Sequence, residues 1–164
     1  MNNVLFLLCP TDCLESTINK VYKSENYFYT SLGNSFNIDS ETLLHVKELI
    51  MKHSIKEINF VLSSDNKIIL DALEGQFFSE IKGMKKIYKE IEKQKRASEM
   101  LWKTENNSLS ILSYYLNNRI KEFQFKLGKL SIQLIIKGKI YNEYNKSLTN
   151  IYPDLLCLEE HFLN

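Results

Sequence analysis

The sequence has few of the residues that interrupt regular structure. Its 164 residues include five glycines and two prolines, whereas average usage would give roughly 20 of the two together. Tight turns should therefore be few and long helices common. A Gly-rich phosphate-binding loop, a nucleophile elbow and a Ser/His/Asp arrangement are also missing. The sequence thus gives no support to nucleotide binding or to serine-hydrolase chemistry.

An excess of positive charge is missing as well. The chain has 21 Lys and Arg residues against 20 Asp and Glu residues, a formal net charge of +1. This balance predicts binding neither to nucleic acid nor to an anionic membrane surface. The charged string KKIYKEIEKQKR is interrupted by Glu90 and Glu92. We therefore interpret it as the solvated face of a helix.

Long apolar runs are absent, and cysteines are few. No run approaches the ~18 apolar residues of a membrane span. The N-terminal run from Val4 to Cys9 has no Lys or Arg before it, unlike a secretory signal. Three cysteines, an odd and low number, are typical of a reducing compartment, so a cytoplasmic location is predicted.

Apolar residues are plentiful enough for one packed domain. Hydrophobic residues make up 44% of the chain and aromatic residues 12%, which suffices for a substantial core. The length fits a single unit spanning residues 1–164.

Strand-like and helical patterns alternate over the first 67 residues. The apolar run at 3–9 is typical of a strand buried on both faces. Asp12 and Glu15 have the spacing of a capping box, which predicts a helix directly after this strand. Such alternation predicts a parallel sheet with right-handed crossovers. Two more strands are predicted, 27–30, closed by Gly33 with a positive φ, and 58–62, and the second helix is predicted to start near Asp39 or Ser40. The residues predicted to be buried are Leu14, Ile18, Val21 and Tyr22 in the first helix and Leu43, Val46, Leu49 and Ile50 in the second.

The second half begins with helical periodicity and then alternates. A helical pattern over 68–100 buries Met84, Tyr88 and Ile91, and a second over 104–126 has an apolar stripe from Leu109 to Phe123. The period of two from Leu130 to Ile136 predicts a fourth strand, with a hairpin return through 148–152 and a short helix after Pro153.

Four features in this order resemble the β-class carbonic anhydrases. They are the strand ending at Cys9, the pair Gly33-Asn34 after the second strand, the segment KEINFVLSSDNK, and the late KLSIQLIIKGKIYNEYNKSLTNI. The resemblance implies an α/β, three-layer fold with a four-stranded, mainly parallel sheet flanked by helices, plus an extra edge strand. It also implies a homodimer, for which the aromatic pairs Phe77-Phe78 and Tyr114-Tyr115 would supply interface material.

The resemblance also indicates that the chemistry of that family has been lost. Cys9 stands at the first zinc-ligand position, but the other two ligand positions fall on Ser64 and Lys67. A hydroxyl and an ammonium cannot replace the imidazole and thiolate of a Cys₂His zinc site. The Asp and Arg of the family's first motif fall on Thr11 and Cys13, and the Arg of the second falls on Thr30. We therefore expect no zinc, no other cofactor and no CO₂ hydration.

Three hypotheses remain for the function. The first is a non-catalytic binding or structural protein. The second is a metal-independent enzyme or a module that binds a small anion weakly, because Ser64, Asp65 and Lys67 lie where a strand end meets a helix N-terminus. Helix capping by these polar residues is the competing explanation for that string. The third is a metal protein built from Cys9, Cys13, Cys157 and His161. The candidate cleft of the second hypothesis comprises Cys9, Asp12, Asn34, Ser64, Asp65 and Lys67.

Overall fold

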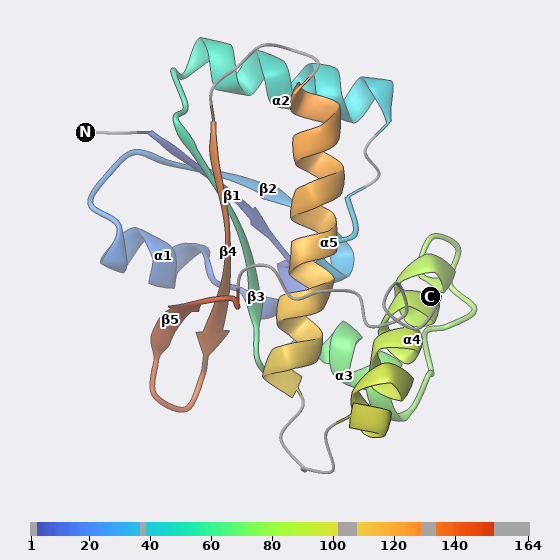
Figure 1. The fold of residues 1–164 in the computed structure, drawn as a ribbon. Coiled ribbons are helices and arrows are strands. Elements are labelled where there is room, and N and C mark those ends of the chain that lie inside the picture. Colours follow the sequence, from blue (N-terminus) through green and yellow to red (C-terminus); the bar gives the residue numbers. More distant parts are fainter. Residues whose placement is uncertain (1–2, 37–38, 102–107, 129–133, 153–164) are drawn as a thin grey trace.

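The computed structural model describes residues 3–36, 39–101, 108–128 and 134–152 (Figure 1). Strands and helices alternate in its first half, as the sequence predicts. The elements are β1 (Val4–Leu8), the 3₁₀ turn η1 (Pro10–Asp12), α1 (Glu15–Val21), β2 (Asn26–Thr30), the 3₁₀ turn η2 (Leu32–Asn34), α2 (Ser40–Lys52), β3 (Glu57–Ser63), α3 (Lys67–Glu74), α4 (Lys85–Leu101), α5 (Ser108–Gly128), β4 (Ile135–Asn142) and β5 (Ser147–Asn150).

One mixed sheet organises the described residues. Its strand order is β2-β1-β3-β4-β5, and the first four strands are parallel. β5 runs antiparallel to β4 as the return of a hairpin. The predicted α/β fold, with a four-stranded parallel sheet and an extra edge strand, is confirmed.

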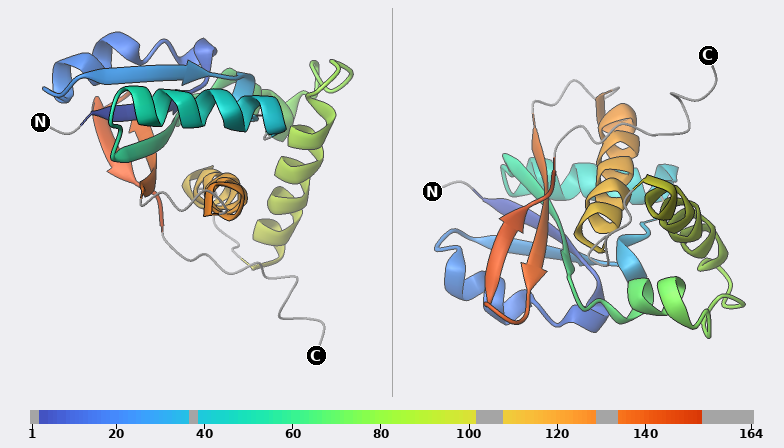
Figure 2. Two further views of the ribbon diagram at one scale, coloured as in Figure 1. Left: turned by 90° about the horizontal axis from the view of Figure 1, so that it is seen from above. Right: turned by 60° about the horizontal axis from the view of Figure 1, so that its bottom comes forward.

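Helices cover both faces of the sheet, which gives three layers (Figure 2). Alternate residues of β1 point to opposite faces. Leu5 and Leu7 join the larger core, formed with α2, α3, α4 and α5. Phe6 and Leu8 join a smaller core, which Leu14 and Ile18 of the α1 segment complete. All five residues of β1 are buried, as predicted for a strand covered on both faces.

The predicted start of the second helix and the positive φ of Gly33 are confirmed. α2 begins at Ser40, and the Asp39 carboxylate caps it by accepting a hydrogen bond from the Thr42 N–H at 2.8 Å. Gly33 has a φ of +58°, the left-handed conformation that glycine adopts at low cost. Val46 and Ile50 of α2 are buried as predicted.

The predicted start of α1 is wrong. Pro10 begins a 3₁₀ turn, Cys13 then takes a left-handed conformation, and α1 starts only at Glu15 without a side-chain cap. Asp12 does not cap this helix, because its carboxylate is bonded elsewhere. Val21, predicted to be buried, is 58% exposed.

The predicted continuous helix over 68–100 is two helices. α3 ends at Glu74, and the chain folds back before α4 begins at Lys85. The Asp71 carboxylate holds this connection, since it accepts hydrogen bonds from the Phe77 and Phe78 N–H groups and from the Tyr88 hydroxyl. Polar side-chain contacts of this kind cannot be read from hydrophobic periodicity. The apolar residues Met84, Tyr88 and Ile91 are nevertheless buried as predicted.

The late strand passes close beneath α5. Gly138 of β4 leaves no space for a side chain, because an added Cβ would lie 2.4 Å from Ile151 and 3.0 Å from Ile120. Residues 129–133 and the helix predicted after Pro153 lie outside the described residues. Within the described part, no helix is both long and apolar enough to cross a membrane.

Candidate functional site

The predicted site residues follow the carboxyl ends of three neighbouring parallel strands. Cys9 and Asp12 follow β1, Asn34 lies in η2 after β2, and the string from Ser64 to Lys67 joins β3 to α3. Open α/β sheets bind ligands at this edge. The sheet order β2-β1-β3 therefore brings the three connections to one edge, as the resemblance implied.

The Cys9 sulfur lies inside a hydrogen-bonded chain. Cys9 is 1% exposed, and its Sγ accepts a hydrogen bond from the Gly33 N–H at 3.1 Å. The Thr11 hydroxyl lies 3.0 Å from the same sulfur. The Gly33 carbonyl accepts a bond from the Tyr115 hydroxyl at 2.7 Å. Cys9 is thus tied through Gly33 to a tyrosine of α5.

Asp12 bridges two segments that lie far apart in sequence. One carboxylate oxygen accepts a hydrogen bond from the Ser63 N–H at 2.8 Å, and the other accepts one from the Asn66 side-chain amide at 2.7 Å. Both oxygens therefore fasten η1 to the turn that follows β3.

Asn66, rather than Asp65, caps α3. The Asn66 side-chain oxygen accepts a hydrogen bond from the Ile69 N–H at 3.0 Å, and this side chain is fully buried. Asp65 is exposed and accepts a hydrogen bond from the Ser64 hydroxyl at 3.2 Å. The prediction that this string caps a helix is therefore correct. Sequence alone could not decide which residue is the cap, because Ser64, Asp65 and Asn66 are all good helix N-caps.

Asn34 has a structural contact of its own. Its side-chain N–H donates to the Val61 carbonyl at 2.7 Å, which links η2 to β3. The residue is fully buried with a φ of 57°. Its side-chain oxygen has no hydrogen-bond partner among the described residues.

Ser64 and Lys67 take no part in the contacts around Cys9. The Ser64 N–H bonds to the Tyr141 carbonyl at 2.8 Å, so its backbone extends the pairing of β3 with β4. Lys67 is exposed at the first position of α3. In the described part of the chain, no hydrogen bond or ion pair joins either residue to Cys9. The predicted site therefore divides into a buried network and an exposed helix start.

Sequence reasoning missed the α5 side of this network. Tyr115 is fully buried, and burial raises the pKa of its hydroxyl, which stays protonated and donates to Gly33. Arg119 lies over the Tyr115 ring and pairs with Glu90 at 2.7 Å and Glu122 at 3.2 Å. In the sequence, Tyr115 stands out only as one of two adjacent tyrosines, which does not indicate its hydrogen-bond partner. The predicted use of Tyr115 at an interface is therefore wrong, since it belongs to the core.

Burial dominates the electrostatics of Asp12. Removal from water raises the pKa of its carboxyl, and Glu15 adds to the effect. The hydrogen bonds from Ser63 and Asn66 oppose the rise by stabilising the ionised form. The net direction is upward.

These residues do not fit a zinc ion. Of the three positions that the resemblance assigns to ligands, only Cys9 carries a zinc-binding group, and its sulfur is engaged by Gly33 and Thr11. Among the described residues, no group of three or more His, Cys, Asp or Glu side chains could hold a metal ion. Cys13 is exposed, and Cys157 and His161 lie outside the described residues.

A cavity elsewhere in the molecule shares no residue with this site. It has a volume of about 440 Å³ and lies between α5 and the β4–β5 hairpin, where Ile120, Gly138 and Ile151 line it.

Comparison with solved structures identifies the fold. No family model and no curated protein sequence matches this chain. The β-carbonic anhydrase CafD of the filamentous fungus Aspergillus fumigatus superposes with a TM-score of 0.71 at 14% identity, covering 93% of this chain and 90% of that one. A structure of the tetrameric β-carbonic anhydrases of the ascomycete Sordaria macrospora gives 0.69 at 13% identity, over 95% and 81% of the chains.

A third solved structure agrees. The Coccomyxa β-carbonic anhydrase in complex with acetazolamide gives a TM-score of 0.70 at 11% identity, covering 92% of this chain and 72% of that one. The chain therefore has the β-carbonic anhydrase fold, as the four sequence features implied.

Removing the Asp12 carboxylate should loosen the site measurably. Asp12→Ala leaves the Ser63 N–H and the Asn66 amide without their acceptor, so we expect the free energy of unfolding to fall by about 1–3 kcal/mol. Asp65→Ala is the matched control, because it removes an exposed carboxylate nearby and should change stability by less than about 0.5 kcal/mol. Urea unfolding measures both. Equal effects of the two substitutions would contradict the bridging role.

The same pair of variants tests the sign of the Asp12 pKa. Because the folded state raises this pKa, the native protein holds the proton more tightly than the unfolded chain. The contribution of Asp12 to stability should be greatest below the unfolded-state pKa and should fall as the pH rises through the native-state pKa. An opposite trend in the difference between the wild type and Asp12→Ala would contradict this.

Proposed function

We propose that this chain is a non-catalytic, zinc-free protein of β-carbonic anhydrase fold with a binding or structural role, and that residues 1–164 form one domain. The observation that supports the proposal most directly is that internal hydrogen bonds occupy the polar groups at the carboxyl edge of the parallel sheet. Cys9 is engaged by Gly33 and Thr11, and the Asp12 carboxylate binds the turn after β3. The cytoplasmic location stays a prediction from cysteine usage.

The charge pattern of the site supports the same proposal. Zinc-dependent hydration of CO₂ needs a bound metal ion that lowers the pKa of its water ligand to about 7. The ligand position at Lys67 carries a positive charge, which would repel such an ion. Ser64 offers a neutral hydroxyl that hydrogen-bonds to its neighbour Asp65.

Zinc binding should require new ligands. Wild-type protein dialysed after exposure to zinc should retain well below one zinc per chain and show no CO₂ hydration above background. The double variant Ser64→His/Lys67→Cys places the family's ligand types at the two positions that the resemblance assigns to them and should retain more zinc. Ser64→Ala/Lys67→Ala is the control for changes at the same positions. Elemental analysis decides, and stoichiometric zinc in the dialysed wild type would overturn the proposal.

Weak binding of a small anion is a second candidate, favoured by the exposed Lys67 at the first position of α3. The Lys67 and Ile68 N–H groups have no acceptor within the helix, because the first four N–H groups of any α-helix are orphans. Asn66 satisfies only the Ile69 N–H. An anion here would meet the positive helix end and the Lys67 ammonium. Asp12 limits the effect, since its carboxylate already binds the preceding turn.

We expect bicarbonate, sulfate or phosphate to bind in the millimolar range, equivalent to about −4 kcal/mol. Amide chemical shifts should move chiefly at residues 63–68, and the movement should disappear in Lys67→Ala. Lys56→Ala, which removes an exposed lysine elsewhere, should leave the titration unchanged. Shifts scattered over the surface, or equal losses in both variants, would leave helix capping as the role of this string.

A homodimer is the remaining part of the proposal. The connection between α3 and α4 exposes Phe77 (84%) and Phe78 (42%). Exposed neighbouring aromatic side chains are enriched at protein interfaces. Tyr115 no longer contributes to this argument, because it lies in the core. The solved Sordaria macrospora enzymes are described as tetrameric.

Light scattering should give twice the chain mass of 19.3 kDa at micromolar concentration. Phe77→Ser should shift the equilibrium towards the monomer by removing an apolar contact. Phe125→Ser is the matched control, since Phe125 is a 71% exposed phenylalanine on α5. A wild-type protein that stays at 19.3 kDa would contradict the dimer.

A further inference from the structure

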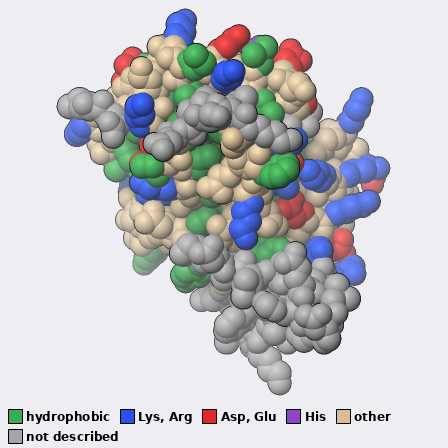
Figure 3. All heavy atoms as spheres, turned by 45° about the horizontal axis from the view of Figure 1, so that its top comes forward, with side chains coloured by type: hydrophobic (Ala, Val, Ile, Leu, Met, Phe, Trp, Pro, Cys, Tyr) green, Lys and Arg blue, Asp and Glu red, His purple; other side chains and the backbone are tan. Residues whose placement is uncertain are grey.

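Positive charge is concentrated on one segment of this nearly neutral chain. Residues 82–96 contain seven Lys and Arg residues and two Glu residues, a formal charge of 7 − 2 = +5, whereas the whole chain carries +1. Figure 3 shows Lys and Arg side chains gathered at the edge of the molecule over α4. The seven basic residues are Lys82, Lys85, Lys86, Lys89, Lys93, Lys95 and Arg96.

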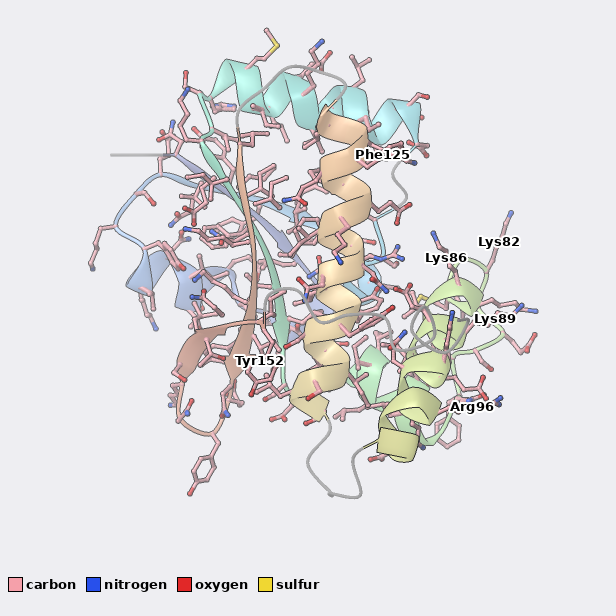
Figure 4. The ribbon with its side chains drawn as sticks, viewed as in Figure 1. Lys82, Lys86, Lys89, Arg96, Phe125 and Tyr152 are labelled. Atoms are coloured by element: carbon pink, nitrogen blue, oxygen red, sulfur yellow. The ribbon has the colours of Figure 1, made fainter. Side chains whose placement is uncertain are left out.

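The packing of α4 directs part of this charge outward. Its apolar face is buried, with Ile87 and Ile91 at 2% and 0% exposure. In Figure 4, Lys82, Lys86, Lys89 and Arg96 lie along the outer edge of the molecule, from the turn before α4 towards its far end. The side chains of Lys86 and Arg96 are 71% and 74% exposed. We call these four residues the basic stripe.

Glu90 does not lie on the outer side of α4. Glu92 and Glu90 both interrupt the run of positive charge in the sequence. The Glu90 carboxylate instead points to α5, where it pairs with Arg119 at 2.7 Å and accepts from the Asn118 amide at 3.3 Å. An acidic residue that is neutralised on the inner side of the helix does not interrupt the outer side.

Two carboxylates do contact the stripe. Glu92 pairs with Arg96 at 2.6 Å, and Glu122 lies 3.8 Å from Lys86. Exposed pairs of this kind contribute only about 0–1 kcal/mol, so a phosphate can displace them at little cost. Among the described residues, Lys82 and Lys89 make no ion pair with a carboxylate.

We propose that the basic stripe binds the phosphodiester backbone of a single-stranded nucleic acid. Lys82 lies in the turn before α4, and Lys86, Lys89 and Arg96 follow along α4 at spacings of three and seven residues, one and two helical turns. A flexible single strand can adjust its phosphate positions to such a row of cations, and each neutralised phosphate releases counterions. Lysine neutralises phosphate as a point charge without reading the bases. The stripe therefore fits a strand of any sequence.

An anionic membrane fits these observations less well. Peripheral helices insert an apolar face into the bilayer, and the apolar face of α4 is already buried against α3 and α5. A single line of charge on a convex helix also matches a linear polyanion better than it matches a plane. The basic stripe lies apart from the residues at the carboxyl edge of the sheet, so this inference does not depend on the proposed loss of zinc.

The test is fluorescence anisotropy of a labelled 20-nucleotide oligothymidylate with the full chain. Binding should weaken with salt, with a log–log slope of about −2 to −3 for three or four neutralised phosphates. Lys82→Ala/Lys86→Ala/Lys89→Ala should weaken binding at least about tenfold and reduce the slope by about 2. Lys20→Ala/Lys23→Ala/Lys52→Ala removes the same charge from exposed lysines outside the α4 segment and should leave the affinity unchanged.

Three outcomes would overturn the proposal. The first is no salt-dependent binding of the oligonucleotide at low salt. The second is an equal loss in the two triple variants, which would mean that only net charge matters. The third is binding to phosphatidylserine vesicles without binding to the oligonucleotide, which would assign the stripe to a membrane surface instead. Circular dichroism of both variants shows whether the fold is retained.

Discussion

The Asp12 carboxylate holds together the edge of the sheet on which the rest of the site depends. It accepts one bond from the Ser63 N–H and one from the buried Asn66 side chain. Asn66 in turn caps α3, so the start of that helix is fixed by a residue of the first connection. A buried carboxylate without partners would be costly. With both oxygens bonded, it orders η1, the end of β3 and the start of α3 at once.

The fold is specified by its apolar core, and the residues at the carboxyl edge of the sheet contribute little to that core. The core of the sheet consists of side chains such as Leu5, Phe60 and Ile58, which are fully buried. Their packing is set by the burial of apolar area and does not depend on which side chains stand at the carboxyl edge of the sheet. This explains how a TM-score of 0.71 accompanies 14% identity.

The chain also shows that net charge is a poor guide to a surface. Glu90 and Arg119 form an ion pair whose side chains are 15% and 9% exposed. The pair adds nothing to the net charge, yet it removes a negative group from the outer side of α4. Long-range attraction depends on how charges are distributed over a surface as well as on their sum. A nearly neutral protein can therefore present a basic face.

Local sequence pattern predicts the βαβαβ succession of the first half, the start of α2 near Asp39 and the positive φ of Gly33. Each of these follows from residues close together in the chain or from hydrophobic period. The roles of Asp12, Glu90 and Tyr115 follow instead from contacts between distant segments. Asp12 meets Ser63 across 51 positions, and Tyr115 meets Gly33 across 82. A polar side chain takes whichever partner the packed elements bring to it, and local pattern contains no record of that partner.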